Sequence, residues 1–517
     1  MLLAALLAIA YLVFQPVTAD LAAQAFRSDL FASHGFLIWN NGWYAGHYLP
    51  GYSILFPPLG AVLGPRLAGA LAAVTSAGLF SSLVGHRYGD RARLATLWFG
   101  AGTGTMLFTG RLTFALGVAI GLGALLALQR RRPRLAAALA LLTPCASPVA
   151  GVFLVLAGMA VLLTGDRRGG AAVAVPAAAA VASLSIAFPT AGHEPFVFTA
   201  FLGVPLFAVG ALMLLPRDER TLRWGAAVYA IAATASFAFA NPMGGTMARL
   251  GALAAGPVAA LGLAGRRQVA LAVVALPLLY WQWVAPVRDI SRTIGDPAAS
   301  QSYYQPLLAE LKRLTHGKPV RVEIPPTRGR WEAEYVAPQF PLVRGWLRQL
   351  ESGDFDRFTD RKQLTPRAYR NWLHRQGVDL IAVPDTTPDP LSRREKALIR
   401  HGLPYLRPVW SNRHWSLYAV RDASGLVSPK KAPKSPGAPD ARLTGLGPDW
   451  FKLAVRRPGR YLVRVHFTSY WTVTDGKACV GPAGQWTKLR VKRPGKVRVA
   501  TRFSLGGLFG RHSECSA

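Results

Sequence analysis

The chain has 517 residues and a formal net charge of +33 at pH 7, and its two parts differ in composition. Residues 1–290 contain 19 Arg, no Lys and 8 acidic residues, whereas residues 291–517 contain the other 40 basic residues and 18 acidic ones. The first part is a series of apolar runs about as long as membrane spans, which excludes a wholly soluble protein. We therefore expect a polytopic α-helical membrane protein with a large soluble C-terminal portion. Contact with anionic lipid headgroups explains the positive charge more simply than nucleic acid does, so no nucleic-acid partner is expected.

Eleven membrane spans are predicted, and the connectors between them alternate in charge. The expected spans cover residues 1–17, 67–85, 92–109, 112–128, 134–147, 148–164, 171–188, 196–215, 223–240, 249–264 and 268–285. The Arg-rich connectors all fall on one side, at residues 85–93, 129–134, 165–170, 217–223 and 265–268. The positive-inside rule assigns that side to the cytoplasm. We therefore expect a multi-pass protein of the cell membrane with a cytoplasmic N-terminus, an external loop 18–66 and extracytoplasmic C-terminal domains.

The first apolar segment also resembles a secretory signal peptide. Residues 17–19, with the sequence Val-Thr-Ala, would form its cleavage site. The segment has no basic residues before its apolar run, which favours an uncleaved span. Both alternatives give the same topology for the rest of the chain.

The first external loop opens with a helix that is polar on one side. Asp20, Gln24 and Arg27 are spaced to share that side, and apolar residues cover most of the other, which is typical of a helix in the membrane interface. Residues 33–60 are aromatic and rich in Gly and Pro, and such backbone is tolerated at membrane depth only where protein or a water-filled cavity covers it. Two interpretations stay open: Asp20 and Arg27 form a surface ion pair, or Asp20 is a general base at an outward-facing cavity. The residues predicted to line that cavity from this loop are His34, Trp43, Tyr44 and His47.

Several of these features together resemble the GT-C superfamily of membrane glycosyltransferases. They are the acid just beyond the first span, the long first external loop, the many spans, the helix pair broken at residues 143–148 and the external C-terminal region. The resemblance implies transfer of a sugar from a polyprenyl-phosphate donor to a cell-envelope glycan or lipid acceptor on the outer face of the membrane. It also implies that Asp20, with Asp29 as second candidate, is the catalytic base. Leu21 follows Asp20 where a metal site would want a second acid, so no metal is expected, and no cofactor besides the donor substrate.

Other polar residues on the predicted outer side are candidates for contacts with substrate. Arg111 and Arg249 each open a span there, and together with Arg27 they are predicted to bind the donor phosphate, since Arg grips phosphate with two hydrogen bonds. The alternative for the two span arginines is that they simply reach out to the interface. His193 and Glu194 are predicted to orient an acceptor sugar, or else to be exposed loop residues.

The soluble half is predicted to contain two modules joined by a linker. Helical and extended stretches alternate in residues 291–425, which indicates a small α/β domain. Residues 426–441 have the composition of a flexible linker, and period-2 alternation around Pro-Gly turns in residues 442–517 indicates a β-sandwich. The stretches GVDLIAVPD, PGRYLVRVHFTSYW and GKACVGPAGQWTKLRV resemble the external region of YfhO-like bacterial membrane proteins.

Aromatic and charged residues of the soluble half suggest further contacts with a glycan. Trp331, Glu332 and Arg344 are predicted to cap the membrane cavity and hold an acceptor, or else to belong to a packed loop. Tyr470 and Trp471 are suited to stack on a sugar ring, although a place in the core of the sandwich is favoured.

Cysteine usage agrees with an external C-terminal region. Cys479 and Cys515 lie in the last module, and they are predicted either to form a disulfide in an oxidising compartment or to remain free thiols. Cys145 lies within the broken span and is interpreted as a small apolar residue.

The leading hypothesis for function is a membrane glycosyltransferase of the GT-C type. The first alternative is a non-catalytic assembly or scaffold protein of the cell envelope, whose external modules carry the function. The second is a transporter of lipid or polysaccharide, which would require internal symmetry and ionisable residues at mid-membrane. The sequence shows neither of these two features.

Overall fold

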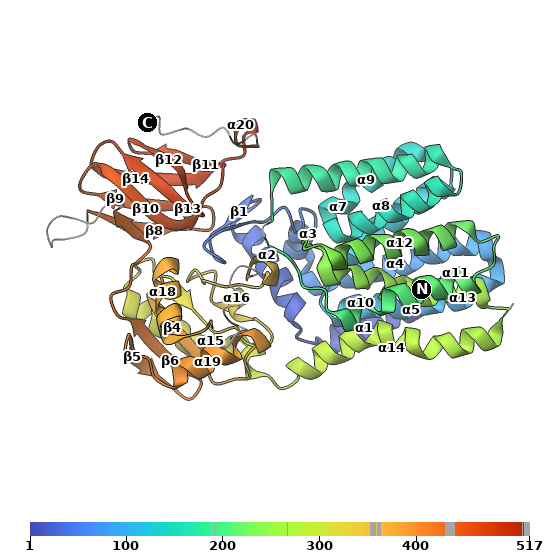
Figure 1. Cartoon of the computed structure of the whole chain (residues 1–517), viewed down its shortest axis with the longest axis horizontal. Helices are drawn as coiled ribbons and strands as arrows, with labels where there is room; N and C mark the ends of the chain where they lie inside the picture. The colour runs from blue at the N-terminus through green and yellow to red at the C-terminus, as the bar shows by residue number, and fades with distance from the viewer. Residues whose placement is uncertain are drawn as a thin grey trace. The chain divides into compact units, whose positions relative to one another are not determined.

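The computed structural model describes residues 1–190, 192–265, 267–351, 358, 363–429, 440–508 and 510. The chain divides into two compact units. The first comprises Met1–Gly35 and Pro50–Ile294, and the second comprises Phe36–Leu49 and Gly295–Ala517. The first unit is helical, and the described strands all belong to the second (Figure 1). The prediction of an apolar helical part followed by a part rich in β-sheet is confirmed.

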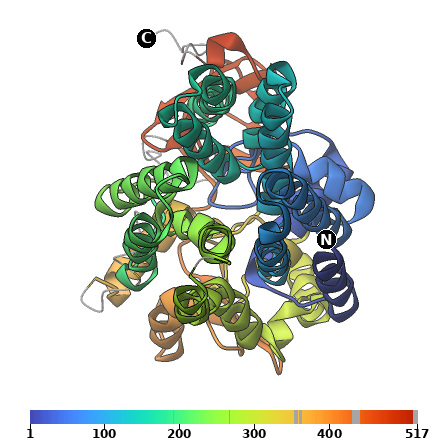
Figure 2. The ribbon, with the colours of Figure 1, turned by 90° about the vertical axis from the view of Figure 1, so that its right-hand side faces the viewer.

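The helices of the first unit mostly run alongside one another, as a view along their axes shows (Figure 2). They are α1 (Leu2–Phe14), α2 (Ala19–His34), α3 (Phe56–Leu63), α4 (Pro65–Tyr88), α5 (Ala92–Phe108), α6 (Leu112–Gln129), α7 (Pro133–Ala146), α8 (Pro148–Leu163), α9 (Arg167–Ala187), α10 (Phe198–Phe201), α11 (Gly203–Leu214), α12 (Arg220–Ala238), α13 (Ala248–Leu263) and α14 (Gln268–Thr293), with the 3₁₀ turns η1 (Gly89–Arg91) and η2 (Gly244–Met247). Small residues allow the close packing: a Cβ on Gly158 of α8 would come 2.8 Å from the amide nitrogen of Ala174 in α9.

Each of the eleven predicted spans contains a helix, but the predicted number of spans is not confirmed. Within the described residues, five helical stretches are long and apolar enough to cross a membrane, or six if the bent pair α1 and α2 forms one span. The five are Pro65–Phe108, Leu112–Gln129, Arg167–Ala187, Gly244–Leu263 and Gln268–Thr293. Helices α7 and α8 have only 14 and 16 residues, fewer than the roughly 20 that span the hydrocarbon. The apolar helices fit a membrane protein.

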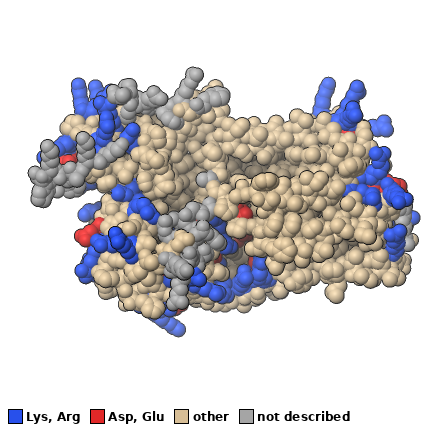
Figure 3. Space-filling view, viewed as in Figure 1, with Lys and Arg blue, Asp and Glu red and all other residues tan. Residues whose placement is uncertain are grey.

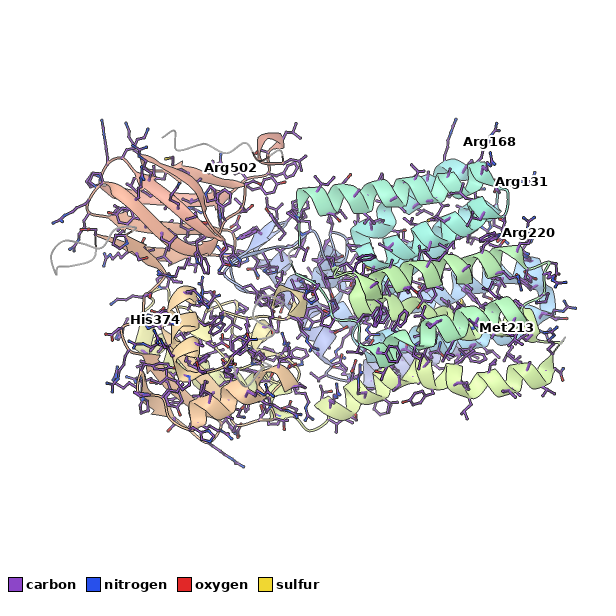
Figure 4. All side chains as sticks on the ribbon, viewed as in Figure 1. Arg131, Arg168, Met213, Arg220, His374 and Arg502 are labelled. Carbon is purple, nitrogen blue, oxygen red and sulfur yellow. The ribbon has the colours of Figure 1, made fainter. Side chains whose placement is uncertain are left out.

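The Arg-rich connectors of the first unit gather at one end of its helices. Arg131, Arg168 and Arg220 all project from that end (Figure 4), and the basic side chains there contrast with the uncharged flank of the helices (Figure 3). Two of these connectors are joined directly, because Tyr88 and Arg87 donate hydrogen bonds to the Glu219 carboxylate at 2.7 and 3.1 Å. The alternation of charge that the sequence shows is therefore an asymmetry between the two ends of the helical unit.

The second unit begins with an α/β part, residues 295–426. Its elements are η3 (Pro297–Ala299), α15 (Gln301–Thr315), β3 (Val322–Glu323), α16 (Glu332–Tyr335), η4 (Arg348–Glu351), α18 (Pro366–Gln376), β4 (Leu380–Pro384), η5 (Pro390–Ser392), α19 (Arg393–Arg400), β5 (Leu406–Ser411) and β6 (Trp415–Val420). The four strands form one sheet in the order β3-β4-β6-β5, in which only the β3–β4 pair is parallel. All five residues of β4 are buried, as expected for a central strand covered on both faces.

The rest of the second unit is a two-sheet module, residues 427–501. One antiparallel sheet has the order β12-β13-β10-β7 and the other β11-β14-β9-β8. The strands are β7 (Val427–Pro429), β8 (Ala441–Leu446), β9 (Trp450–Val455), β10 (Gly459–His466), β11 (Trp471–Asp475), β12 (Ala478–Ala483), β13 (Trp486–Val491) and β14 (Gly495–Thr501), followed by the short helix α20 (Leu505–Leu508). Buried residues alternate with less buried ones along β9 and β10, so each sheet buries one face. Most of the predicted linker, residues 430–439, lies outside the described residues.

The segment Phe36–Leu49 is built into the second unit although it lies far from it in the sequence. Its strands β1 (Trp39–Asn40) and β2 (His47–Tyr48) pair with each other. Its backbone also bonds to both parts of the unit: Leu342 donates its amide to Gly42 at 2.8 Å, and His466 donates its amide to Ala45 at 2.7 Å. The polypeptide therefore passes between the two units three times.

Candidate functional site

The first unit brings Asp20, Arg111 and Arg249 together at the starts of three different helices. Arg111 Nε donates a hydrogen bond to Asp20 Oδ2 at 3.4 Å, and Arg249 Nη2 lies 4.0 Å from the same oxygen. The three side chains are only 22% or 23% exposed. One carboxylate is thus held between two guanidinium groups at the end of the helices that is opposite the Arg-rich connectors, because Asp20 follows α1 and Arg111 precedes α6.

A glycine brings Arg111 close to the start of α2. Gly110 has a φ of +75°, and a Cβ there would lie 2.6 Å from the Leu21 amide nitrogen and 2.7 Å from the Thr18 hydroxyl. Only glycine adopts this backbone conformation and this close approach without strain. The turn between α5 and α6 can therefore press against the first turn of α2, where Asp20 lies.

A turn also lies before Arg249, and it is held by polar contacts of Asn241. The Asn241 Oδ1 accepts hydrogen bonds from the amides of Met243 and Gly244 at 2.9 and 3.0 Å, and the Asn241 carbonyl accepts one from the Glu194 amide at 3.1 Å. Glu194 is half-buried and interacts electrostatically with Arg249. The neighbouring His193 is exposed, so of this predicted pair Glu194 is the residue connected to the cluster.

A second carboxylate, Asp289 on α14, belongs to the same cluster and escaped the sequence analysis. It interacts electrostatically with Arg111 and Asp20, and Arg288 Nε donates a hydrogen bond to its Oδ1 at 3.3 Å. The sequence signal that could have identified Asp289 is an acidic residue at the outer end of a span. The last span was predicted to end at residue 285, four residues before Asp289, so this signal was not recognised. The helix in fact continues to Thr293, which places Asp289 on a rigid element.

Of the other polar residues of α2, some are buried in the first unit and others are exposed. Arg27 is 3% exposed, and its guanidinium lies 3.8 Å from the centre of the Tyr52 ring, to whose hydroxyl Gln24 Nε2 donates a hydrogen bond at 2.7 Å. Asp29 and His34 are exposed near the end of the helix. The ion pairs of Asp20 lead to Arg111 and Arg249, so of the two acids it is Asp20 that belongs to the charged cluster.

Three residues predicted to line the membrane cavity lie in the interior of the second unit. Trp43 is fully buried, stacks on His47 with ring centroids 5.2 Å apart, and donates its indole hydrogen to the Ala333 carbonyl at 2.9 Å. Tyr44 is 7% exposed and donates its hydroxyl hydrogen to Glu351 at 3.1 Å. These contacts make the segment part of the packed core of the second unit.

The predicted acceptor residues of the α/β part are also buried, among charged partners. Arg344 is 6% exposed and forms hydrogen-bonded ion pairs with Glu323 and Glu395. Glu332 is 3% exposed and accepts hydrogen bonds from the Thr327 amide at 3.2 Å and the Thr327 hydroxyl at 2.6 Å. Burial raises the pKa of the Glu332 carboxyl to about 7. This is the geometry of a packed loop, the second of the two interpretations.

Trp331 is 4% exposed and stacks on Tyr335, with ring centroids 5.3 Å apart. Tyr470 and Trp471 are 1% and 3% exposed, which is the core position that the sequence favoured.

Cys479 on β12 is disulfide-bonded. The predicted partner, Cys515, lies outside the described residues, so the pairing stays a prediction.

In the described part of the chain, no group of three or more His, Cys, Asp and Glu side chains is placed to hold a metal ion. Comparison with protein-family models and with curated proteins gives no match. The chemistry of the site follows from its own charges: two guanidinium groups that suit a phosphate, beside a carboxylate that can accept a proton.

Proposed function

We propose that the protein is a membrane glycosyltransferase of the GT-C type that transfers a sugar from a polyprenyl phosphate to a hydroxyl of a cell-envelope acceptor. The observation that carries the proposal is the ion-paired cluster of Asp20, Arg111 and Arg249, assembled at the starts of α2, α6 and α13. A lipid-linked sugar phosphate supplies an anion that the arginines can bind, and the acceptor supplies a hydroxyl that the carboxylate can deprotonate. A cluster at the end of apolar helices also suits a substrate whose tail is a lipid.

In the proposed reaction, Arg111 and Arg249 bind the donor phosphate with charge-assisted hydrogen bonds. Their attraction to the incoming anion weakens their hold on Asp20, so its carboxylate becomes available as a base. Asp20 accepts the proton of the acceptor hydroxyl while the hydroxyl oxygen bonds to the anomeric carbon of the sugar. The bond between that carbon and the phosphate oxygen breaks, and polyprenyl phosphate leaves with its negative charge stabilised by the two arginines.

The charge asymmetry of the first unit supports an extracytoplasmic location for this reaction. The Arg-rich connectors occupy the end opposite Asp20, and the positive-inside rule assigns that end to the cytoplasm. The cluster and the C-terminal unit, which follows α14, would then face outside. Membrane-attached envelope polymers are accessible as acceptors on that side.

The test is sugar transfer by purified Asp20→Asn protein in nanodiscs, with a panel of polyprenyl-phosphate sugars as donors. Asparagine keeps the size of the side chain but cannot accept the proton, so we expect turnover to fall about 10²- to 10⁴-fold. Asp90→Asn is the matched control, since Asp90 is 88% exposed and lies in the connector between α4 and α5, at the Arg-rich end. Transfer by Asp20→Asn at the wild-type rate would disprove the role of this carboxylate.

A scaffold function for the second unit is the other candidate. The observation that favours it is the burial of Trp43, Tyr44 and His47 in that unit, which gives the first loop a structural role. A scaffold predicts that Asp20→Asn leaves cell-envelope assembly intact while Trp43→Ala, which damages the second unit, abolishes it. Loss of assembly in both variants would favour the enzyme.

A further inference from the structure

The two-sheet module has an outer face that is basic and centred on one tryptophan. On β9, Phe451, Leu453 and Val455 point inward and are at most 4% exposed, so the alternate residues Trp450 and Lys452 point outward. On β14, Val497 and Val499 point inward in the same way, so Lys496 and Arg498 point outward. We call the outward side of these two strands the β9–β14 face.

Like charges are directly opposed on this face. Lys452 and Arg498 are cross-strand partners in the antiparallel register of β9 and β14. Such a pair is destabilising in the isolated protein, because two cations with neighbouring Cβ atoms repel each other. On its other side Arg498 faces Asp475, a lone acid at the end of β11. The arrangement is the one expected where an external anion lies between the two cations.

The tryptophan is held in the same place as the cations. Lys452 Nζ lies 5.1 Å and Arg498 Cζ 4.9 Å from the centre of the Trp450 ring. The ring also lies against two glycines of the neighbouring strand and turn, since a Cβ on Gly447 would come 2.3 Å from its indole nitrogen and one on Gly445 3.0 Å from its benzene edge. The sheet therefore leaves space for an indole along its surface, and the two cations lie over the ring of this indole.

The surrounding module has the charge of a polyanion-binding surface. Residues 441–510 contain 14 Lys and Arg but only two acidic residues, Asp449 and Asp475. Neither β9 nor β14 contributes to the large apolar side chains that are exposed in the described structure. A face of cations around one partly buried indole suits a soluble anionic chain better than insertion into lipid.

We propose that the β9–β14 face binds a glycan chain that carries carboxylate or phosphate groups. Lys452 and Arg498, which lie over the Trp450 ring in the free protein, would turn to an anionic group, and the apolar C–H face of a sugar would then take their place on the indole. Single-stranded nucleic acids are bound by several aromatic side chains in succession, whereas this face has one. The inference does not depend on the reaction at Asp20, since the two sites belong to different units.

The test uses the full chain in neutral phosphatidylcholine nanodiscs and calorimetric titration with alginate oligosaccharides, which are linear glycans with one carboxylate per sugar. We expect binding that weakens as salt is added, and no binding of neutral dextran oligosaccharides of equal length. Lys452→Gln with Arg498→Gln should weaken alginate binding about tenfold or more, the effect of about 1.4 kcal/mol. The matched control, Lys492→Gln with Arg493→Gln, removes the same charge from the exposed turn between β13 and β14 and should leave binding within about twofold.

A second measurement separates a binding face from a structural one. Removing the opposed cations relieves their repulsion but also removes their contacts with the Trp450 ring, so the unfolding temperature of the free Lys452→Gln, Arg498→Gln protein should stay within about 4 °C of that of the wild type. A larger fall in the unfolding temperature, or equal loss of alginate binding in the control variant, would overturn the proposal. Binding to phosphatidylglycerol vesicles without binding to alginate, or tighter binding of a single-stranded oligonucleotide than of alginate, would also overturn it.

Discussion

Burial in the second unit shifts the pKa of a single residue, Glu332. Its carboxyl is 3% exposed, and burial raises its pKa to about 7, compared with about 4.3 for an exposed glutamate. Between these two pKa values the folded protein keeps a proton that the unfolded chain releases. Stability from this group is therefore complete below about pH 4 and falls as the pH rises towards 7.

We predict that Glu332→Gln flattens the pH dependence of unfolding. One pKa unit corresponds to about 1.4 kcal/mol, so the wild type should lose roughly 3 kcal/mol between pH 4 and pH 8 from this group, and the variant should not. The measurement is the free energy of unfolding of both proteins across this range. Asp422→Asn, at a carboxylate that is 85% exposed, is the control and should follow the wild type. Parallel curves for wild type and Glu332→Gln would contradict the assignment.

At the scale of one element, the segment Phe36–Leu49 depends on a close contact between Trp43 and Gly345. A Cβ on Gly345 would lie 2.5 Å from Trp43 Cγ. Because the indole is fully buried, neither the ring nor the backbone of Gly345 has space to move away. This contact joins the segment to the stretch that contains Arg344. It explains why a glycine is required at a position whose backbone is not in the left-handed region.

We predict that Gly345→Ala destabilises the second unit by about 1–3 kcal/mol through overpacking. Trp43→Ala should lower stability by about 3–5 kcal/mol, and in that background Gly345→Ala should have little further effect because the ring is gone. Denaturant unfolding of the four proteins measures this cycle. Gly481→Ala, whose Cβ would meet nothing closer than 3.8 Å, should change stability by less than about 0.5 kcal/mol. Full additivity of the two substitutions would refute the contact.

The elements that could be predicted from sequence are those whose signal is local. The helices of the first unit follow from apolar runs that end at charged connectors, and the strands of the two-sheet module follow from alternation around turns. The partners of Phe36–Leu49 could not be predicted, because β1 and β2 have two residues each and the indole of Trp43 meets a carbonyl 290 residues away. Short strands paired across such a separation have no periodic signature.

The residues of the candidate site could be predicted from local signals, but their arrangement in space could not. Asp20, Arg111 and Arg249 are charged residues at ends of apolar runs on one predicted side, and that side could be inferred from connector charge. Their mutual distances depend on how α2, α6 and α13 pack, which local patterns do not contain. Asp289 was missed because the last apolar helix extends eight residues beyond its predicted end, from 285 to Thr293.

At the scale of the whole molecule, the two ends of the first unit differ in charge, and the positive-inside rule assigns the Arg-rich end to the cytoplasm. We predict that a single cysteine in place of Arg168 is cytoplasmic and one in place of His193 is external, in a protein that also carries Cys145→Ser. Both positions are exposed in the described structure. A membrane-impermeant maleimide applied to intact cells should label His193→Cys and should label Arg168→Cys only after lysis. The reverse pattern would show that the orientation is inverted.

The insertion of Phe36–Leu49 into the second unit also sets the order of events during biosynthesis. The ribosome makes this stretch first, and the residues that enclose it, such as Ala333 and His466, emerge about 290 residues or more later. At the usual speed of translation the delay is on the order of tens of seconds. During that interval Trp39, Trp43 and Tyr44 have no native cover, so nascent chains should be unusually dependent on a chaperone that shields aromatic side chains.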